Sequence, residues 1–410
     1  MIKNIDQSSK ICCFIIAILP IMQLYGFSFF PLLTFADYLL LLLIVISLYK
    51  TNSLNHLYCL GLVVYLLIQP LFVLCTTTNL AVDNIDMIGT AWRLAFYVMS
   101  ICFLSKEIIS LRGLQWAFRI VGSINVVYAV LQYTLGTFLK ISLTPYLPFL
   151  PIVRAGLEEQ QIGWINYGWT VRARGFFAEP SHIAIYMLLA LAIELFSARK
   201  NKLFICGYAI GIAVSYSSTG FVALIFLFIY FIFVNQRNIF TQITGRKLLV
   251  GGGVIVICCV IFAFSGYLTD VIDHIFANGK GITSQSHFAD IEETLRQPTT
   301  FLEFIFGHGL QEVVTGYVPG WIGSYYCLGV IGVIIYLFVF ITLIRKTNKY
   351  GRGVLLLFIF LNVGTEIMLG IYLVLYIAVA IRFSENAEVT RKCFINERSL
   401  YARDVATFNS

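Results

Sequence analysis

Charged side chains are scarce in this chain. Only 12% of its 410 residues are Asp, Glu, Lys or Arg, which is about half the share found in soluble domains. This shortage excludes an ordinary water-soluble domain. The hydrophobic share of 59% exceeds what one core can bury and suits a lipid bilayer. The net charge of +7 does not indicate nucleic-acid binding, because basic residues in membrane proteins mark the cytoplasmic side.

Motifs for nucleotide and metal chemistry are also missing. The ten cysteines form no CxxC pair and no Cys/His spacing that suits zinc. The sequence has no P-loop, no glycine-rich dinucleotide turn, no HExxH and no nucleophile elbow. We therefore expect no cofactor, no metal and no nucleic-acid partner. The first apolar run begins at Ile11 and lacks a small-residue cleavage site, so we expect an uncleaved first helix.

Long apolar runs dominate what is present. A spanning helix needs about 20 apolar residues. The candidate spans are 11–30, 32–49, 57–75, 87–105, 114–136, 179–198, 203–217, 219–235, 247–267, 320–344 and 354–383. The last run is interrupted by Asn362, Gly364, Thr365 and Glu366, so it is either one tilted helix or two short ones.

Basic residues set the orientation of these spans. With the N-terminus inside, the inside loops collect most Lys and Arg residues. The basic tail 384–410 should also lie inside, which requires an even number of spans and favours splitting 354–383. The predicted fold is a single all-α, polytopic membrane domain over 1–410, with about 12 spans (roughly 11 to 13) and both termini cytoplasmic.

Two connections are too long to be simple turns. Residues 137–178 and 268–319 are predicted to form two large loops on the non-cytoplasmic side, and loops of this length are usually functional or disordered. The second loop carries Phe288, Ile291 and Leu295 at helical spacing before Pro298, a pattern that predicts a short amphipathic helix at the membrane surface.

The densest polar cluster lies where the first long loop enters a span. Arg172, Arg174, Glu179 and His182 fall within eleven residues. Pro180 suits the first turn of a helix, which places Glu179 at the helix start, where the dipole favours an anion. Snorkelling and helix capping account for one arginine and the glutamate, but they do not account for the pair of arginines.

Two further features stand apart from this cluster. Gly307 and Gly309 flank His308, which predicts a tight turn that fixes the imidazole; an ordinary turn with a solvated histidine is the alternative. Arg93 lies in the middle of a span, so it should face the bundle interior and have a partner. Asp37, Glu194 and Glu366 are the carboxylates available within spans.

Arginines at an outer membrane interface suit a membrane-bound anion. A guanidinium grips phosphate through two parallel hydrogen bonds, which a lysine cannot do. Aromatic residues in the same loop, Trp164, Tyr167 and Trp169, could stack on sugar rings. These features together favour a sugar donor carried on a lipid pyrophosphate.

Two short motifs resemble those of Wzy-type O-antigen polymerases, in the O-antigen polymerase and ligase superfamily. The first is Arg172-x-x-Gly175-x-x-x-Glu179-Pro180; the second is the run 306–310, Phe-Gly-His-Gly-Leu, followed by 328–332, Leu-Gly-Val-Ile-Gly. The plan of about twelve spans with two large periplasmic loops is similar over most of the chain. The resemblance implies a metal-independent glycosyltransferase in the bacterial inner membrane.

That resemblance also implies roles for residues. The enzyme would transfer a growing glycan from undecaprenyl pyrophosphate to a new lipid-linked repeat unit, with a chain-length regulator as a possible protein partner and membrane lipid around it. Arg172 and Arg174 would hold the pyrophosphate, and Glu179 or His308 would serve as the general base. The family's second-loop arginine is replaced here by His287, or its work is done by Arg296.

Competing functions remain at this stage. Related ligases carry His-Asn where this chain has Val318 and Pro319, which favours a polymerase over an O-antigen ligase. The polymer could equally be capsule or another exopolysaccharide. A lipid-linked oligosaccharide flippase should line a central cavity with charges from several spans, whereas here mainly Arg93 lies mid-span. A non-catalytic scaffold would not need the loop arginines.

Overall fold

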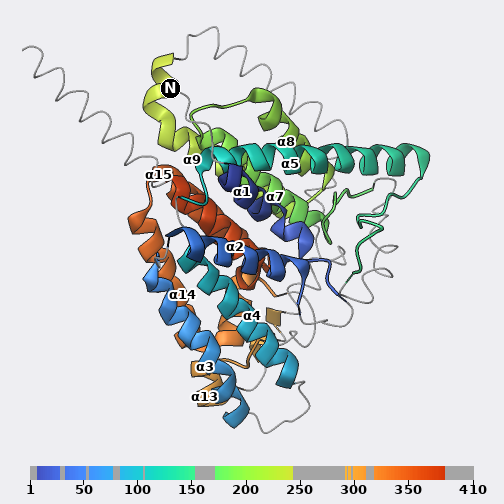
Figure 1. Ribbon diagram of the computed structural model, residues 1–410. Coiled ribbons are helices and arrows are strands. Elements are labelled where there is room, and N and C mark those ends of the chain that lie inside the picture. Colours follow the sequence, from blue (N-terminus) through green and yellow to red (C-terminus); the bar gives the residue numbers. More distant parts are fainter. Residues whose placement is uncertain are drawn as a thin grey trace, which may run out of the picture.

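The computed structural model of the 410-residue chain is built from helices (Figure 1). It describes residues 7–27, 33–51, 55–76, 84–104, 107–152, 171–242, 291–292, 294–296, 299–310 and 318–383, with the side chains of 51, 76, 84–86 and 236–242 left aside. Within these ranges the only β-type pairings are two isolated bridges, Tyr25 with Ile152 and Gly26 with Thr34. The all-helical prediction is confirmed for this part of the chain.

The helices follow the apolar runs of the sequence. They are α1 (Gln7–Met22), α2 (Phe35–Thr51), η1 (Leu57–Cys59), α3 (Leu60–Thr76), α4 (Asn84–Phe103), α5 (Leu111–Thr134), η2 (Leu135–Leu139), α7 (Pro180–Phe196), α8 (Lys202–Val214), α9 (Ser218–Gln242), α13 (Phe301–Phe306), α14 (Gly320–Lys346), α15 (Lys349–Leu361), η3 (Ile367–Leu369) and a last helix, Ile371–Phe383.

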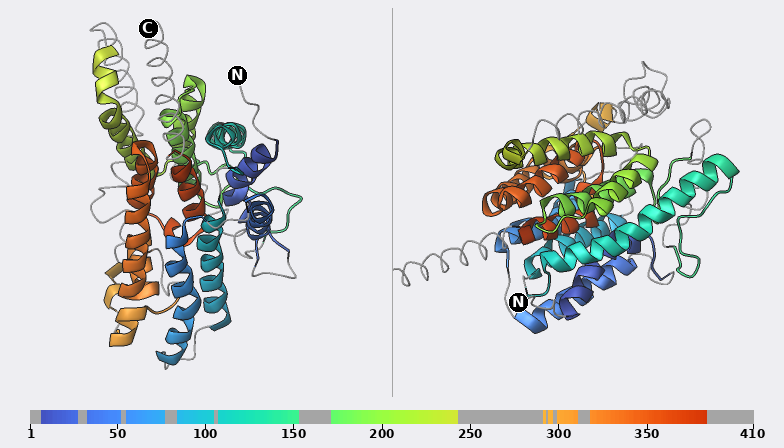
Figure 2. Two further views of the ribbon diagram at one scale, coloured as in Figure 1. Left: turned by 60° about the vertical axis from the view of Figure 1, so that its left-hand side comes forward. Right: turned by 90° about the horizontal axis from the view of Figure 1, so that it is seen from above.

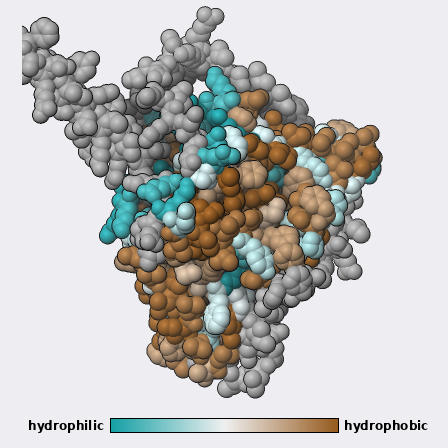
Figure 3. Space-filling model, viewed as in Figure 1, coloured by the Kyte–Doolittle hydropathy of each residue, from teal (hydrophilic) through white to brown (hydrophobic). Residues whose placement is uncertain are grey.

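Four of the described helices are long and apolar enough to cross a membrane. They cover Leu57–Cys75, Leu111–Leu139, Ser218–Asn235 and Gly320–Lys346, and five shorter apolar helices accompany them. Apolar side chains cover most of the described surface on the face shown in Figure 3. The chain therefore has the character of a helical membrane protein, while the count of about twelve spans stays a prediction.

Three of the predicted boundaries differ from the structure or lie outside it. The span predicted at 11–30 is wrong at its end, because α1 stops at Met22 and the following backbone bonds to Pro151 and Phe35. The span predicted at 247–267 and the tail 384–410 lie outside the described residues. The interruption expected within 354–383 is present, since α15 ends at Leu361 and the next helix begins at Ile371.

The helices do not share one direction. In the left view of Figure 2, α3, α4 and α14 run upright while α5 is seen nearly end-on, so α5 crosses them at a steep angle. Helix α5 packs against α1, α7 and α8, whereas α3 packs against α4, α13 and α14. The two predicted site segments lie on these two different groups of helices.

The exposed ends of α14 and α15 carry positive charge. Arg345, Lys346, Lys349 and Arg352 are all exposed around the junction of these helices, where Figure 3 shows a hydrophilic patch. Such a cluster next to long apolar helices is what the positive-inside rule expects at a cytoplasmic surface.

Candidate functional site

A short segment before α7, residues 171–179, is called the arginine loop here, and α5 holds its backbone. The Gln132 side chain, which is buried in α5, accepts hydrogen bonds from the backbone N–H groups of Arg174 (3.1 Å) and Gly175 (2.8 Å). The same side chain donates from Nε2 to the Gly175 carbonyl at 3.1 Å. One amide side chain therefore replaces the backbone partners that this loop lacks.

Asn125 continues this cradle about two turns earlier on α5. Its Oδ1 accepts from the Phe176 N–H at 3.2 Å, and its Nδ2 donates to the Val121 carbonyl at 2.9 Å. Gly175 lies between these contacts with φ +59°, and a side chain there would press on Ile183 and Asn125. Glycine is therefore required where the loop approaches α5 most closely.

The guanidinium of Arg174 is enclosed by the loop it belongs to. Its side chain is 9% exposed, and Nη1 donates to the Ala178 carbonyl at 3.1 Å. Burial lowers the pKa of Arg174, while Tyr146 and Glu179 oppose that shift. Because a guanidinium keeps its charge at any physiological pH, the shift reflects the cost of burying a cation. An anion beside it would reduce that cost.

Arg172 lies two residues earlier in the loop. It is half-buried, and the intervening Ala173 is fixed by a 3.0 Å hydrogen bond from its N–H to the Val214 carbonyl at the end of α8. At the loop's start, the Val171 N–H donates to Thr137 Oγ1 (3.3 Å). The two ends of the first long connection, 137–178, therefore meet beside α5.

Glu179 sits at the N-cap of α7, and Pro180 opens the helix, as the sequence predicts. The Glu179 side chain makes no capping bond to the helix backbone; instead its carboxylate accepts from Ser181 Oγ at 3.0 Å. The structure brings Glu179 and Arg174 close enough for their charges to interact. A carboxylate and a guanidinium therefore share one end of an apolar helix.

The last helix packs alongside α7 at this same end. The Tyr372 hydroxyl donates to the His182 carbonyl (3.4 Å) and its ring lies 5.6 Å from the His182 ring, while Tyr376 donates to the Ile185 carbonyl at 2.8 Å. Two tyrosines of the helix Ile371–Phe383 therefore fix the first two turns of α7.

His308 forms a second cluster, built on α3 and α14. Gly307 (φ +80°) and Gly309 (φ +95°) flank it in left-handed backbone conformations, as expected for a tight turn. The His308 ring stacks on Tyr326 with centroids 4.2 Å apart and planes inclined by 8°. The arginine loop is hydrogen-bonded to α5 and α8, so the two predicted clusters have different supports.

Arg296 and His287 belong to the second long connection. Arg296 forms an i,i+4 ion pair with Glu292, and both side chains are largely exposed. This arrangement pairs Arg296 within its own turn rather than with Arg172 or Arg174. His287 lies outside the described residues.

Arg93 has the partner that its position in α4 requires. Its Nε lies 3.5 Å from Oδ2 of Asp37 in α2, and Asp37 also accepts from the Tyr97 hydroxyl at 2.8 Å and from the Thr34 N–H at 2.7 Å. Asp37 is buried. The carboxylate is thus satisfied by its own surroundings, which makes this ion pair a packing element between α2 and α4.

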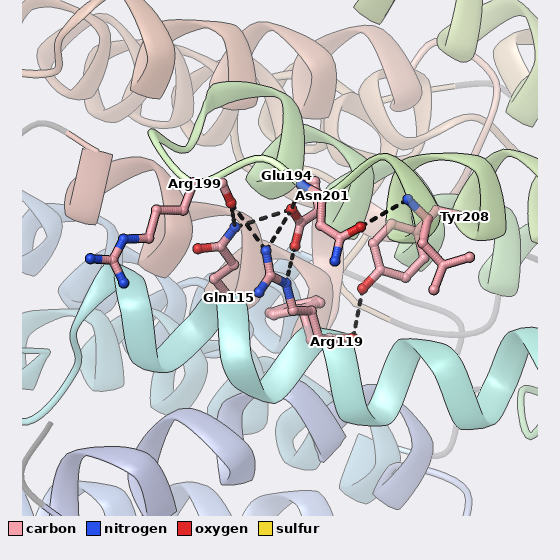
Figure 4. Close-up of polar contacts among 8 residues, drawn as sticks. Gln115, Arg119, Glu194, Arg199, Asn201 and Tyr208 are labelled. Atoms are coloured by element: carbon pink, nitrogen blue, oxygen red, sulfur yellow. Dashed lines mark hydrogen bonds and ion pairs between the residues drawn. The ribbon is translucent and has the colours of Figure 1, made fainter. Parts of the chain in front are cut away.

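The sequence did not single out a further ion pair between α5 and α7 (Figure 4). Glu194 is 1% exposed and accepts from Arg119 Nε at 2.6 Å, from Arg119 Nη2 at 3.1 Å and from Gln115 Nε2 at 3.1 Å. Both α5 side chains also donate to the Arg199 carbonyl. The end of α7 away from Glu179 is therefore also fastened to α5.

Among the described residues, no group of three His, Cys, Asp or Glu side chains is placed to hold a metal ion. No protein-family model matches the chain, and no curated protein matches it either. The motif resemblance to O-antigen polymerases is therefore an expectation from the sequence, and the chemistry proposed below rests on the residues themselves.

Proposed function

We propose that this chain is a membrane glycosyltransferase that polymerises lipid-linked oligosaccharides. It would transfer a growing glycan from undecaprenyl pyrophosphate to a new lipid-linked repeat unit at the periplasmic face of the bacterial inner membrane. Arg174 carries the proposal. Arg174 is 9% exposed, follows half-buried Arg172 by two residues, and belongs to a loop that is hydrogen-bonded to α5. Such a preorganised cation suits a phosphate group that accumulates charge during a reaction.

The chemistry would proceed by direct displacement at the anomeric carbon of the donor. A hydroxyl of the acceptor sugar forms the new carbon–oxygen bond while the bond to the pyrophosphate oxygen breaks, and the departing pyrophosphate takes the electron pair. Arg172 and Arg174 would neutralise that charge, so no metal is needed for the step. The hydroxyl proton would go to Glu179 or His308, the two candidate bases.

The arrangement of the other charges favours an enzyme over a flippase. The described pairs Arg93–Asp37 and Arg119–Glu194 join helices to one another, which occupies the charges that a flippase would need for a moving cargo. An O-antigen ligase and a capsule or exopolysaccharide polymerase would use the same phosphate-binding arginines, and they differ from the proposal in the acceptor.

The test is replacement of the loop arginines in the host cell. Arg174→Ala and Arg172→Ala should leave protein levels normal and abolish long polysaccharide chains, because losing one preorganised donor costs about 10²–10³ in rate. Arg112→Ala is a matched control, since Arg112 is exposed in the first turn of α5. The product pattern is read on a gel of lipopolysaccharide.

Each rival predicts a different pattern. A polymerase defect leaves core carrying a single repeat unit, a ligase defect leaves bare core with lipid-linked polymer accumulating, and a flippase defect traps single repeat units inside the cell. Polymer of normal length in the Arg172→Ala, Arg174→Ala double variant would remove the proposal. Purified protein and a defined lipid-linked repeat unit, with and without chelator, test the metal-independent step directly.

A further inference from the structure

The turn that carries His308 interlocks with a kink in α14. Gly329 interrupts α14 with φ +63° and ψ −173°. A side chain on Gly329 would collide with the Ile305 carbonyl, and one on Gly307 would collide with the Cys327 carbonyl. The two segments therefore pack backbone against backbone, at a distance that only glycine permits.

At the kink, carbonyl groups of α14 lack the hydrogen bonds that a regular helix would give them. Backbone N–H groups of the His308 turn donate to these carbonyls instead. The Tyr326 carbonyl accepts from the His308 N–H at 2.9 Å, and the Cys327 carbonyl accepts from the Gly309 N–H at 3.0 Å. In a membrane interior, unpaired backbone groups are costly, so these bonds hold the turn in place.

Gln69 of α3 joins both sides of this junction with a single amide group. Its Nε2 donates to the Phe306 carbonyl of the turn (2.9 Å) and to the Cys327 carbonyl of α14 (3.0 Å). Its side chain is 0% exposed, within an apolar span of mean hydropathy 2.3. The hydroxyl of Tyr65, one turn earlier, donates to the Leu328 carbonyl. A buried glutamine is expensive in such a helix unless its polar atoms are used.

The contact between the turn and α14 also determines which nitrogen of the His308 ring carries the hydrogen. Nδ1 lies 3.3 Å from the Tyr326 carbonyl oxygen. A carbonyl oxygen can only accept, so a neutral imidazole bonded in this way carries its hydrogen on Nδ1, and Nε2 is then the basic nitrogen of the ring. Stacking on the Tyr326 ring fixes the plane of the imidazole.

We propose that Gln69 is a positioning residue that holds His308 in the tautomer and orientation of a general base. This inference rests on the proposed glycosyltransferase function and concerns His308, one of its two candidate bases. Gln69 acts through two carbonyls, those of Phe306 and Cys327, and it does not touch the reacting groups. Its removal should therefore affect turnover and leave substrate binding unchanged.

The first experiment does not depend on activity. Diethyl pyrocarbonate modifies neutral imidazoles, and peptide mass spectrometry follows each histidine separately. In Gln69→Leu, His308 should react about tenfold faster than in the parent protein, because the variant loses both Gln69 hydrogen bonds to the turn and to α14. The His182 rate should not change. Gln23→Leu makes the same chemical change in the segment after α1 and is the control.

The second experiment measures polymerisation of a defined lipid-linked repeat unit by the purified full chain. Gln69→Leu should lower kcat by about 10²-fold, the effect of misplacing a catalytic group by about 1 Å, and leave KM unchanged. Tyr65→Phe removes one donor from the same junction and supplies the comparison if Gln69→Leu is not recovered folded.

Equal His308 modification rates in the parent protein and both variants overturn the inference, as does an unchanged kcat. If the parent protein has no polymerising activity but His308 reacts faster in Gln69→Leu, Gln69 still positions His308. The glycosyltransferase assignment is then wrong. The two proposals therefore fail separately.

Discussion

At the scale of single residues, Gly307 offers the sharpest test of the His308 turn. Its φ of +80° and the Cys327 carbonyl beside it both exclude a side chain. We expect Gly307→Ala to lower the free energy of unfolding by about 1–3 kcal/mol from backbone strain, with a further loss from the collision. The measurement is a denaturation series in mixed micelles, read by circular dichroism.

Gly61 provides the matched control for that substitution. It lies in α3 with open space around it, so Gly61→Ala should be neutral or stabilise the helix by roughly 0.5–1 kcal/mol. Equal stability of the Gly307→Ala and Gly61→Ala proteins would show that the turn is not packed as described.

His56 predicts a pH dependence of stability. Burial, then Arg382 and Lys346, lowers the pKa of His56 to about 4 from its ordinary value of 6.5. Between about pH 6.5 and pH 4, His56 is protonated in the unfolded chain but not in the folded chain. The free energy of unfolding should therefore fall as pH drops from about 6.5 to about 4. His56 has a left-handed backbone (φ 57°), which asparagine also tolerates, so a His56→Asn variant replaces the imidazole without straining the backbone.

His56→Asn should therefore remove this part of the acid sensitivity. The measurement is the midpoint of thermal unfolding of the detergent-solubilised parent and variant across that pH range. The two curves should agree near neutral pH and diverge below about pH 6.5, with the variant the more stable. Parallel curves throughout would mean that His56 titrates normally in the folded protein.

Residue types alone predicted part of this local structure, namely the His308 turn and the need for a partner to Arg93. The Gly-His-Gly spacing was enough to predict the tight turn, because no other residue accepts those backbone angles so readily. The cost of a charge in a span was enough to predict that Arg93 has a partner. Which of three carboxylates it would be depends on helix packing: α2 lies against α4, and that contact selects Asp37.

At the scale of elements, α5 acts as a polar-striped support for α7. Its buried face includes Gln115, Asn125 and Gln132, with Arg119 on the same side at 28% exposure. These residues recur at helical spacing. Gln115 and Arg119 bind Glu194 near the end of α7. Asn125 and Gln132 bind the arginine loop, which leads into the start of α7. Helix α7 is therefore fixed to α5 at both ends. This stripe of amides in an apolar helix was the available signal for Arg119.

The ion pair within this support gives a further prediction. Arg119→Leu leaves the Glu194 carboxylate buried with fewer donors and should cost about 3–5 kcal/mol, whereas the double variant Arg119→Leu, Glu194→Leu should cost less than Arg119→Leu alone. Unfolding of both proteins in mixed micelles measures the difference. If the double variant is less stable than Arg119→Leu, the two side chains do not depend on each other.

At the scale of the whole molecule, hydropathy predicted where helices form but not how they meet. Apolar runs are sufficient for helices because a buried backbone must pair within itself. The early end of α1 at Met22 follows from tertiary bonds, Gly26 to Pro151 and Phe35 to Tyr25, that no periodicity reveals. The contact between the 306–310 turn and the kink at Gly329 likewise joins motifs that are separate in the sequence.

The C-terminal pair of helices forms a hairpin that bears on the topology. Asn348, just before α15, donates from its side chain to the Phe383 carbonyl at the end of the last helix. At the other end, the Gly320 N–H at the start of α14 donates to the Thr365 carbonyl between the two helices. Phe383 thus returns to the side where α14 meets α15. The last helix therefore runs back towards the α14–α15 junction, while the number of spans in the whole chain stays a prediction.

Each arm of this hairpin is short. Helix α15 has 13 residues, which is about 20 Å at 1.5 Å per residue, less than the roughly 30 Å of a bilayer core. We expect Val363 at the tip, 65% exposed, to lie near the outer surface.

In a background with the exposed Cys75 and Cys206 changed to serine, Val363→Cys should react with a membrane-impermeant maleimide added outside intact cells. Lys349→Cys should react only after the cells are opened. Labelling of both positions from the same side would contradict the hairpin. Labelling of Val363→Cys only from inside would reverse the orientation and place the arginine loop, which lies at the same end of α7 as Tyr372, on the wrong side for a periplasmic donor.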